Sequence, residues 1–431
     1  MRQPTTYFFS HIIFNKSVPK DVIFISLLIS FMPIILITGP AIPDIILSFS
    51  SLYFLIKSFY KKLWGYYLNS ITIFFFIFCI YGIFNSLISE MPLISLLEEG
   101  SVFYFRYILF SLCIWYLLDN NPFFSKWFLF VSLFCLSILV IDSFYQYFFK
   151  VNLFGNPKWS EDRLTSLFGD EPIVGRYISY ISIFAFGLIY YSYEVSKKII
   201  LLSIALLVIT EVIIFLSGER APLFYITFFS LLLIIYVPKF RLYRIIGFFV
   251  SLLIISIIIN FNPIAKERIV DSTINQMSET KVPILPYTEL HERHYITGIK
   301  MFNKEPLFGI GTNLFEKLCS DERFFYKEGS CATHPHNFYI QLLAEQGIIG
   351  FAFLLSFFLY LTFKHLNQLW LMFFYKKSKP MPFNDFVFVS ILFVYWWPLI
   401  PQMSFYNNWN NIFLMLPLGI LLKSKYGKIQ K

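Results

Sequence analysis

The stretch KIILLSIALLVITEVIIFLSGERAPLFYITFFSLLLIIYV, residues 198–237, decides the fold, because it holds two long apolar runs on either side of a short polar turn. A helix needs roughly 20 apolar residues to cross a bilayer, where the backbone must satisfy its own hydrogen bonds. The rest of the chain follows the same pattern: 57% of its 431 residues are hydrophobic, 14% are charged, and the mean hydropathy is +0.65. Soluble domains carry about 25% charged residues. The composition therefore predicts an integral membrane protein.

Twelve apolar runs of this kind predict an all-α polytopic membrane protein with about twelve transmembrane helices. The expected spans are 21–39, 41–60, 66–88, 100–118, 127–149, 172–192, 198–216, 221–237, 244–262, 338–363, 383–400 and 405–422. We expect no cleavable signal peptide, because the apolar run from Val22 leads into further spans and not into a small-residue cleavage site.

The distribution of basic residues predicts the orientation. With the N-terminus inside, the short cytoplasmic segments hold most of the lysines and arginines, whereas the outer loop around Glu90, Glu98 and Glu99 is acidic. The positive-inside rule fits this arrangement, since it discounts long loops. We therefore expect cytoplasmic termini and outward-facing loops at 150–171 and 263–337. The net charge of +9 reflects this topology, and we expect no nucleic-acid partner.

The chain divides into three parts on this basis. Residues 1–262 are expected to form spans one to nine, residues 263–337 an outward-facing loop, and residues 338–431 spans ten to twelve with a cytoplasmic tail. A loop of this length is too long for a connector, so we expect it to cover the membrane mouth. It should contain a helix over Thr288–Asn303, ended by Pro306 and the glycines that follow.

The five cysteines fall into two groups. Cys319 and Cys331 lie in the outer loop, where an oxidising compartment would let them form a disulfide; the alternative is two free thiols. Cys79, Cys113 and Cys135 fall inside predicted spans and are interpreted as small core residues.

Five arginines are expected at the outer face. Arg220 lies in LSGERAPL between two spans, Arg106 in the outer half of the fourth span, and Arg163 and Arg176 flank SLFGDEPIVG. Together with Arg293 they lie on one side of the membrane. An arginine at membrane depth is a functional hypothesis, and the alternative is snorkelling to lipid headgroups. A guanidinium fork suits phosphate or pyrophosphate, so a shared anionic ligand is favoured.

His334 and His336 stand in THPHN, directly before the tenth span. Histidine is the usual general base because its pKa is near neutral, although a lone histidine is often structural. The sequence shows no third ligand nearby, so we expect base catalysis and no metal. Asn337 could orient one ring, and Glu345 follows two turns along the helix. We expect His336 to matter more than His334, which precedes a proline and lies in an extended segment.

Several of these motifs together resemble the O-antigen ligase and polymerase superfamily. The resemblance covers most of the chain in order, and the HPHN…E.G block with the preceding P.FG.G is its more specific part. One departure is the glutamate in SGER, where a serine commonly precedes the arginine directly. The motifs that carry the resemblance are RLTSLFGDEP at 163–172, SGER at 217–220, EPLFGIG at 305–311, HPHNFYIQLLAEQGIIG at 334–350 and PQMSFYNNWNNIF at 401–413.

The resemblance implies a twelve-span, GT-C-type glycosyltransferase of the Gram-negative inner membrane that needs no metal or other cofactor. Such enzymes transfer a glycan from undecaprenyl pyrophosphate to an acceptor at the periplasmic face. By motif match His336 corresponds to the family's essential histidine, and Arg220 and Arg293 to its essential arginines. Pyrophosphate is already a good leaving group, so the reaction needs chiefly a base and cations. The further residues expected to bind pyrophosphate or glycan are Arg106, Arg163, Arg176, His334, Asn337 and Glu345.

Three functions stay open at this point. The first is ligation of O-antigen onto lipid A–core, and the second is polymerisation, or transfer to a protein hydroxyl, by the same chemistry. The third is a transporter for a lipid-linked sugar, in which basic residues would be spread through both halves of the membrane. Their concentration at one face beside a histidine-bearing loop favours an enzyme.

Overall fold

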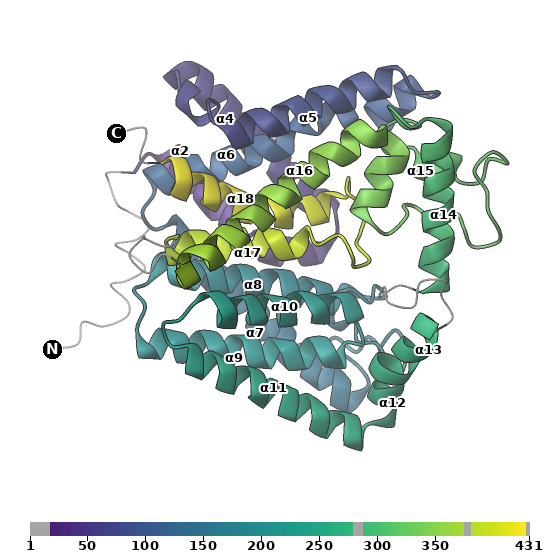
Figure 1. Ribbon diagram of the computed structural model, residues 1–431. Coiled ribbons are helices and arrows are strands. Elements are labelled where there is room, and N and C mark those ends of the chain that lie inside the picture. Colours follow the sequence, from purple (N-terminus) through teal and green to yellow (C-terminus); the bar gives the residue numbers. More distant parts are fainter. Residues whose placement is uncertain (1–17, 279–287, 375–380, 428–431) are drawn as a thin grey trace.

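The computed structural model describes residues 18–278, 288–374 and 381–427. The two ends of the chain that we expect in the cytoplasm, 1–17 and 428–431, lie outside the described residues. Within the described part the protein is helical, with β-structure limited to two isolated bridges in the loop after α7. Most helices run side by side, while α12, α13 and α14 lie across one end of the bundle (Figure 1).

Every one of the twelve predicted spans coincides with a helix. Residues 18–278 contain α2 (Lys20–Ser30), α3 (Met32–Ile35), α4 (Ala41–Lys61), α5 (Ser70–Leu87), α6 (Phe105–Asn120), α7 (Phe124–Phe149), α8 (Val174–Ser192), α9 (Lys197–Leu216), α10 (Arg220–Tyr236), α11 (Arg241–Phe261), α12 (Pro263–Lys266), the π-helix η6 (Glu267–Asp271) and α13 (Ser272–Ser278). The later residues contain α14 (Glu289–Lys304), α15 (Phe315–Leu318), α16 (Phe338–Phe374), α17 (Phe383–Tyr395) and α18 (Asn408–Tyr426). As expected, the long loop holds short helices.

The helices confirm a multi-pass membrane protein. In the part of the chain that the structure describes, seven helices are long and apolar enough to cross a membrane, or eight if the bent pair α2–α3 is one span. Helices α10 and α17 are apolar but have only 17 and 13 residues. The total of twelve spans therefore stays a prediction.

Helix α16 is broken near its N-terminal end, and the EPLFGIG loop fills the break. Gly347 has a φ of +63°, which ends the regular hydrogen-bonding ladder. The N–H of Ile348 donates to the carbonyl of Pro306 at 2.9 Å, and the N–H of Gly311 donates to the carbonyl of Glu345 at 2.9 Å. Irregular backbone at membrane depth needs such protein partners. The motif thus joins the outer loop to α16.

Two further links hold the outer loop in place. Cys319 and Cys331 form a disulfide with a Cα–Cα distance of 5.1 Å, the pairing that the sequence predicts. Arg323 donates two hydrogen bonds to Glu90, at 2.6 and 2.8 Å, and also pairs with Asp321. These contacts fix the segment that leads into the two histidines before α16.

Candidate functional site

His336 has a strained backbone that the loop after α17 holds in place. Its φ is +56°, in the left-handed region that residues other than glycine seldom adopt. The N–H of Gln402 donates to the carbonyl of His336 at 2.7 Å, and the N–H of Phe338 donates to the Gln402 side chain at 3.1 Å. Such conformations persist where surrounding contacts enforce them, and they are common at functional sites.

Four histidines cluster at this point. The ring of His336 has its centroid 4.2 Å from that of His334, 5.3 Å from His294 and 5.5 Å from His291. His291 and His294 come from α14, where a spacing of three residues places them on one face. Neither was predicted from the sequence; the signal was the HERH spacing at the start of the predicted helix. Among the described residues, no three His, Cys, Asp or Glu side chains converge to hold a metal ion.

The four rings are held in the neutral state. Burial, the largest cause, lowers the pKa of His336 to about 2 and the pKa values of His334 and His291 to about 4, and it also lowers the pKa of His294. Neighbouring histidines and the Arg176 guanidinium depress the pKa of His336 further. Across the described ranges, no hydrogen bond involves the His336 ring. A neutral ring without such a bond can accept a proton from a substrate.

Arg176 is the charged group with open hydrogen-bonding capacity beside these rings. It lies in the first turn of α8, and its guanidinium donates no hydrogen bond within the described residues. Glu219, its carboxylate neighbour, is occupied by the N–H of Gly175 at 2.6 Å and by the Arg176 N–H at 3.2 Å. Burial raises the pKa of Glu219 to about 7, although Arg176 and Arg163 oppose the shift. The glutamate of SGER thus anchors the start of α8.

Arg163 lies near Arg176, and Arg220 lies near Arg163, so the three arginines form a basic rim. Arg220 donates to the side chain of Gln276 at 2.6 Å and to the carbonyl of Arg268 at 3.0 Å, so both partners are neutral. Arg163 donates to the carbonyl of Pro172 at 2.9 Å. Burial lowers the pKa of Arg163, and Arg268 and Arg176 lower it further. The carboxylates near the basic rim therefore balance only part of its positive charge.

Arg293, predicted to be catalytic, is engaged with protein groups. It donates to the carbonyl of Glu328 at 2.8 Å and to the carboxylate of Glu289, one turn earlier on α14, at 2.9 Å. Both terminal nitrogens are thus engaged, whereas Nε has no hydrogen-bond partner among the described residues. The next residue on α14, His294, belongs to the histidine cluster.

Asn337 and Glu345 accept hydrogen bonds from backbone N–H groups around the site. The expectation that Asn337 orients a histidine ring is wrong: its side chain caps the first turn of α16 and donates to the carbonyl of Pro398 at 2.7 Å. The free N–H groups of a helix start need such an acceptor. Glu345 is fully buried and accepts the N–H groups of Phe315 at 3.0 Å and Asn313 at 3.3 Å.

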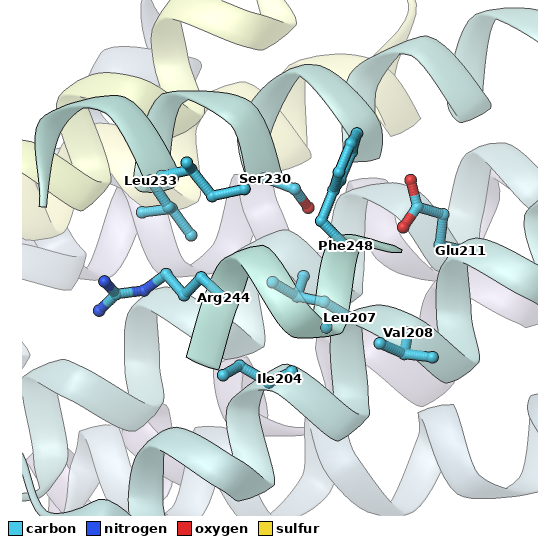
Figure 2. A pocket seen from close by; sticks show the side chains of 10 residues that line it. Ile204, Leu207, Val208, Glu211, Ser230, Leu233, Arg244 and Phe248 are labelled. Atoms are coloured by element: carbon cyan, nitrogen blue, oxygen red, sulfur yellow. The ribbon is translucent and has the colours of Figure 1, made fainter. Parts of the chain in front are cut away.

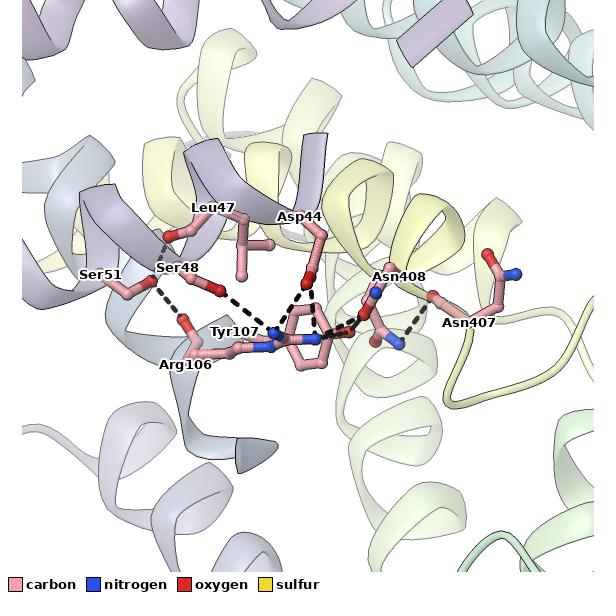
Figure 3. Close-up of polar contacts among 9 residues, drawn as sticks. Asp44, Leu47, Ser48, Ser51, Arg106, Tyr107, Asn407 and Asn408 are labelled. Atoms are coloured by element: carbon pink, nitrogen blue, oxygen red, sulfur yellow. Dashed lines mark hydrogen bonds and ion pairs between the residues drawn. The ribbon is translucent and has the colours of Figure 1, made fainter. Parts of the chain in front are cut away.

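Arg106 lies in a separate network that engages both terminal nitrogens of its guanidinium (Figure 3). Its guanidinium pairs with Asp44 of α4 at 2.9 Å and donates to Ser48 at 3.1 Å and to Asn408 of α18 at 2.7 Å. The network joins three helices, and none of the four histidines belongs to it. The structure therefore does not bring Arg106 together with the histidine cluster.

A buried carboxylate that the sequence analysis also missed lies between α9, α10 and α11 (Figure 2). Glu211 is only 2% exposed and accepts hydrogen bonds from Thr227 and Ser251, each at 2.6 Å. No predicted site residue lines the small pocket beside it. The signal was an acidic residue inside the apolar run 198–216. Its contacts tie the three helices together.

Comparison with known proteins gives one result that bears on this site. Residues 204–355, about a third of the chain, match a family model described as O-antigen ligase. The matched region contains Arg220, Arg293 and the four histidines, and it ends within α16. No curated protein matches the chain. The resemblance to the O-antigen ligase superfamily is therefore confirmed, and the matched region includes the histidine cluster.

Proposed function

We propose, from the O-antigen ligase domain at residues 204–355, that this protein is a glycosyltransferase of the bacterial inner membrane. It moves an undecaprenyl-pyrophosphate-linked glycan onto lipid A–core at the periplasmic face, with inversion and without a metal, as a GT-C-type protein of twelve spans. The observation that carries the proposal is a neutral histidine, His336, held in a strained conformation beside the unpaired guanidinium of Arg176.

The transfer is a single displacement at the anomeric carbon of the donor sugar. A hydroxyl oxygen of the acceptor attacks this carbon, and its proton passes to a ring nitrogen of His336. The bond between the anomeric carbon and the phosphate oxygen breaks, and undecaprenyl pyrophosphate leaves with both electrons of that bond. Attack on the side opposite the leaving group inverts the anomeric configuration.

The basic rim stabilises the departing pyrophosphate. Arg176 has donors to spare, and Arg220 and Arg163 add charge that is held by neutral acceptors. Preorganised cations of this kind favour the transition state, because negative charge grows on the leaving group. The bound pyrophosphate also offsets the neighbouring positive charges. It therefore raises the pKa of His336 and makes the ring a stronger base in the complex.

The direct test is transfer by the purified protein. A synthetic polyprenyl-pyrophosphate glycan is offered together with lipid A–core, and a new glycolipid is sought by mass spectrometry. Product formation that persists in a chelator supports the proposal, whereas strict dependence on an added divalent metal contradicts the mechanism.

A deletion strain separates ligation from its alternatives. Loss of all capped lipopolysaccharide bands with intact lipid-linked polymer indicates a ligase, and single-repeat bands indicate a polymerase. Normal lipopolysaccharide with an unglycosylated protein indicates transfer to a protein hydroxyl. Accumulation of the lipid-linked sugar on the cytoplasmic side would identify a transporter.

A further inference from the structure

We infer that His291 is a fixed hydrogen-bond donor of the site, whose Nε2–H binds a phosphoryl oxygen of the leaving pyrophosphate. The inference rests on the proposed function and adds a residue to which neither the family match nor the sequence motifs assign a role. It depends on three features of His291: its tautomer, its charge and its neighbours.

The start of α14 fixes the tautomer. Thr288 is the N-cap, and its side chain accepts the N–H of His291 at 3.4 Å. In return the backbone N–H of Thr288 donates to Nδ1 of His291 at 3.3 Å, which completes a capping box, and the Thr288 hydroxyl lies 2.9 Å from the same nitrogen. A backbone N–H can only donate, so Nδ1 accepts and the proton of the neutral ring resides on Nε2.

The surroundings keep the ring neutral and close to the base. Its centroid is 5.5 Å from that of His336, and the two rings are nearly perpendicular, at 83°. Burial is the main reason for its lowered pKa, and the charges of Arg220 and Arg176 contribute. Both arginines therefore act electrostatically on His291.

These features give His291 and His336 different tasks. His291 cannot act as the base, because Nδ1 is occupied and Nε2 already carries a proton. It presents a neutral N–H beside the arginines, where pyrophosphate oxygens are expected. A hydrogen bond to a charged group is typically worth enough to change binding about 10- to 100-fold.

Three substitutions separate the donor role from the capping role. Glutamine can cap Thr288 with its oxygen and donate through its amide, whereas glutamate caps without donating and methionine does neither. We expect His291→Gln to stay within about threefold of wild-type transfer, because it keeps both contacts. His291→Met should lose about 10- to 100-fold in kcat/KM, with an equal loss of inhibition by farnesyl pyrophosphate.

Two controls accompany the series. His365→Gln alters a buried histidine of α16 that contacts Ser390 and lies outside the cluster, so transfer and inhibition should stay at the wild-type level. The thermal midpoint monitors the helix cap. If His291→Met does not fold, His291→Glu, which retains the cap, provides the comparison and should show at least as large a loss, because its carboxylate also repels pyrophosphate.

The outcomes distinguish this inference from the proposed function. If His291→Met equals wild type, or if His291→Gln is as impaired as His291→Met, the donor role is overturned while the glycosyltransferase assignment stands. A wild-type loss of rate between pH 7.5 and 5.5 that is absent from His291→Gln would show that His291 itself is the base, and would also overturn it. A folded wild-type protein that neither transfers glycan nor responds to farnesyl pyrophosphate overturns both.

Discussion

The network around Arg106 and the basic rim around Arg176 both contain partly buried guanidinium groups, but they differ in how the charge is satisfied. Arg106 meets a carboxylate, a hydroxyl and an amide from two other helices. Arg176 lies near Glu219, whose oxygens are occupied by backbone N–H groups. An arginine at membrane depth is therefore best placed to bind a ligand where its partners leave the terminal guanidinium donors open.

The largest expected effect concerns His336, the proposed base beside the basic rim. His336→Gln should lower the transfer rate about 10²- to 10⁴-fold, because it removes the proton acceptor. The initial rate of the purified variant measures the effect, and binding of farnesyl pyrophosphate should be nearly unchanged. His365→Gln, a matched substitution outside the cluster, should keep the wild-type rate. Wild-type transfer by His336→Gln would exclude His336 as the base.

The next largest effect concerns Arg176, whose guanidinium has no hydrogen-bond partner among the described residues. Arg176→Gln should lower kcat/KM about 10- to 100-fold, since a charge-assisted contact to the leaving group is lost. The same measurement on Arg106→Gln should show little loss per folded molecule. If Arg106→Gln is the more impaired enzyme, the distinction between the two regions fails.

The same two substitutions should affect stability in the opposite order. Arg106→Gln should lower the free energy of unfolding by about 1–3 kcal/mol, because Asp44 is left partly buried without its cation. Arg176→Gln removes no side-chain hydrogen bond and should leave the thermal midpoint in detergent almost unaltered. An equal loss in both variants would contradict the assignment of a structural role to Arg106 alone.

The smallest effect is the pH dependence. His336 accepts a proton only when neutral, so the rate falls as the pH drops through its pKa. Burial lowers the pKa of the free protein to about 2, and kcat/KM should therefore stay nearly constant from pH 7.5 to 5.5. A histidine with an ordinary pKa near 6.5 would lose about tenfold in kcat/KM at pH 5.5. A titration midpoint near 6.5 would show that burial does not shift this group.

Hydropathy predicts most of the fold. Each apolar run became a helix, because a backbone in lipid has few alternatives. The break of α16 at Gly347 was not predicted, since its hydrogen bonds come from the loop at Pro306, about forty residues earlier in the chain. The disulfide was predictable because Cys319 and Cys331 lie close in sequence within one outer loop.

The residue types of the site were easier to predict from the sequence than the roles of the individual residues. His336 and Arg176 were expected and do lie together, but spacing alone could not show that Asn337 is a helix cap or that Arg293 pairs with Glu289. These roles depend on which groups reach a side chain once the loops fold. The place of His291 in the cluster could not be predicted for the same reason.

The most direct test of the central claim is a structure of the full-length protein with a bound polyprenyl pyrophosphate. The account predicts that the pyrophosphate lies against the Arg176 guanidinium and the Nε2 atom of His291, with the His336 ring facing the first carbon beyond the phosphate. A pyrophosphate bound at Arg106, or at any point away from the histidine cluster, would contradict it.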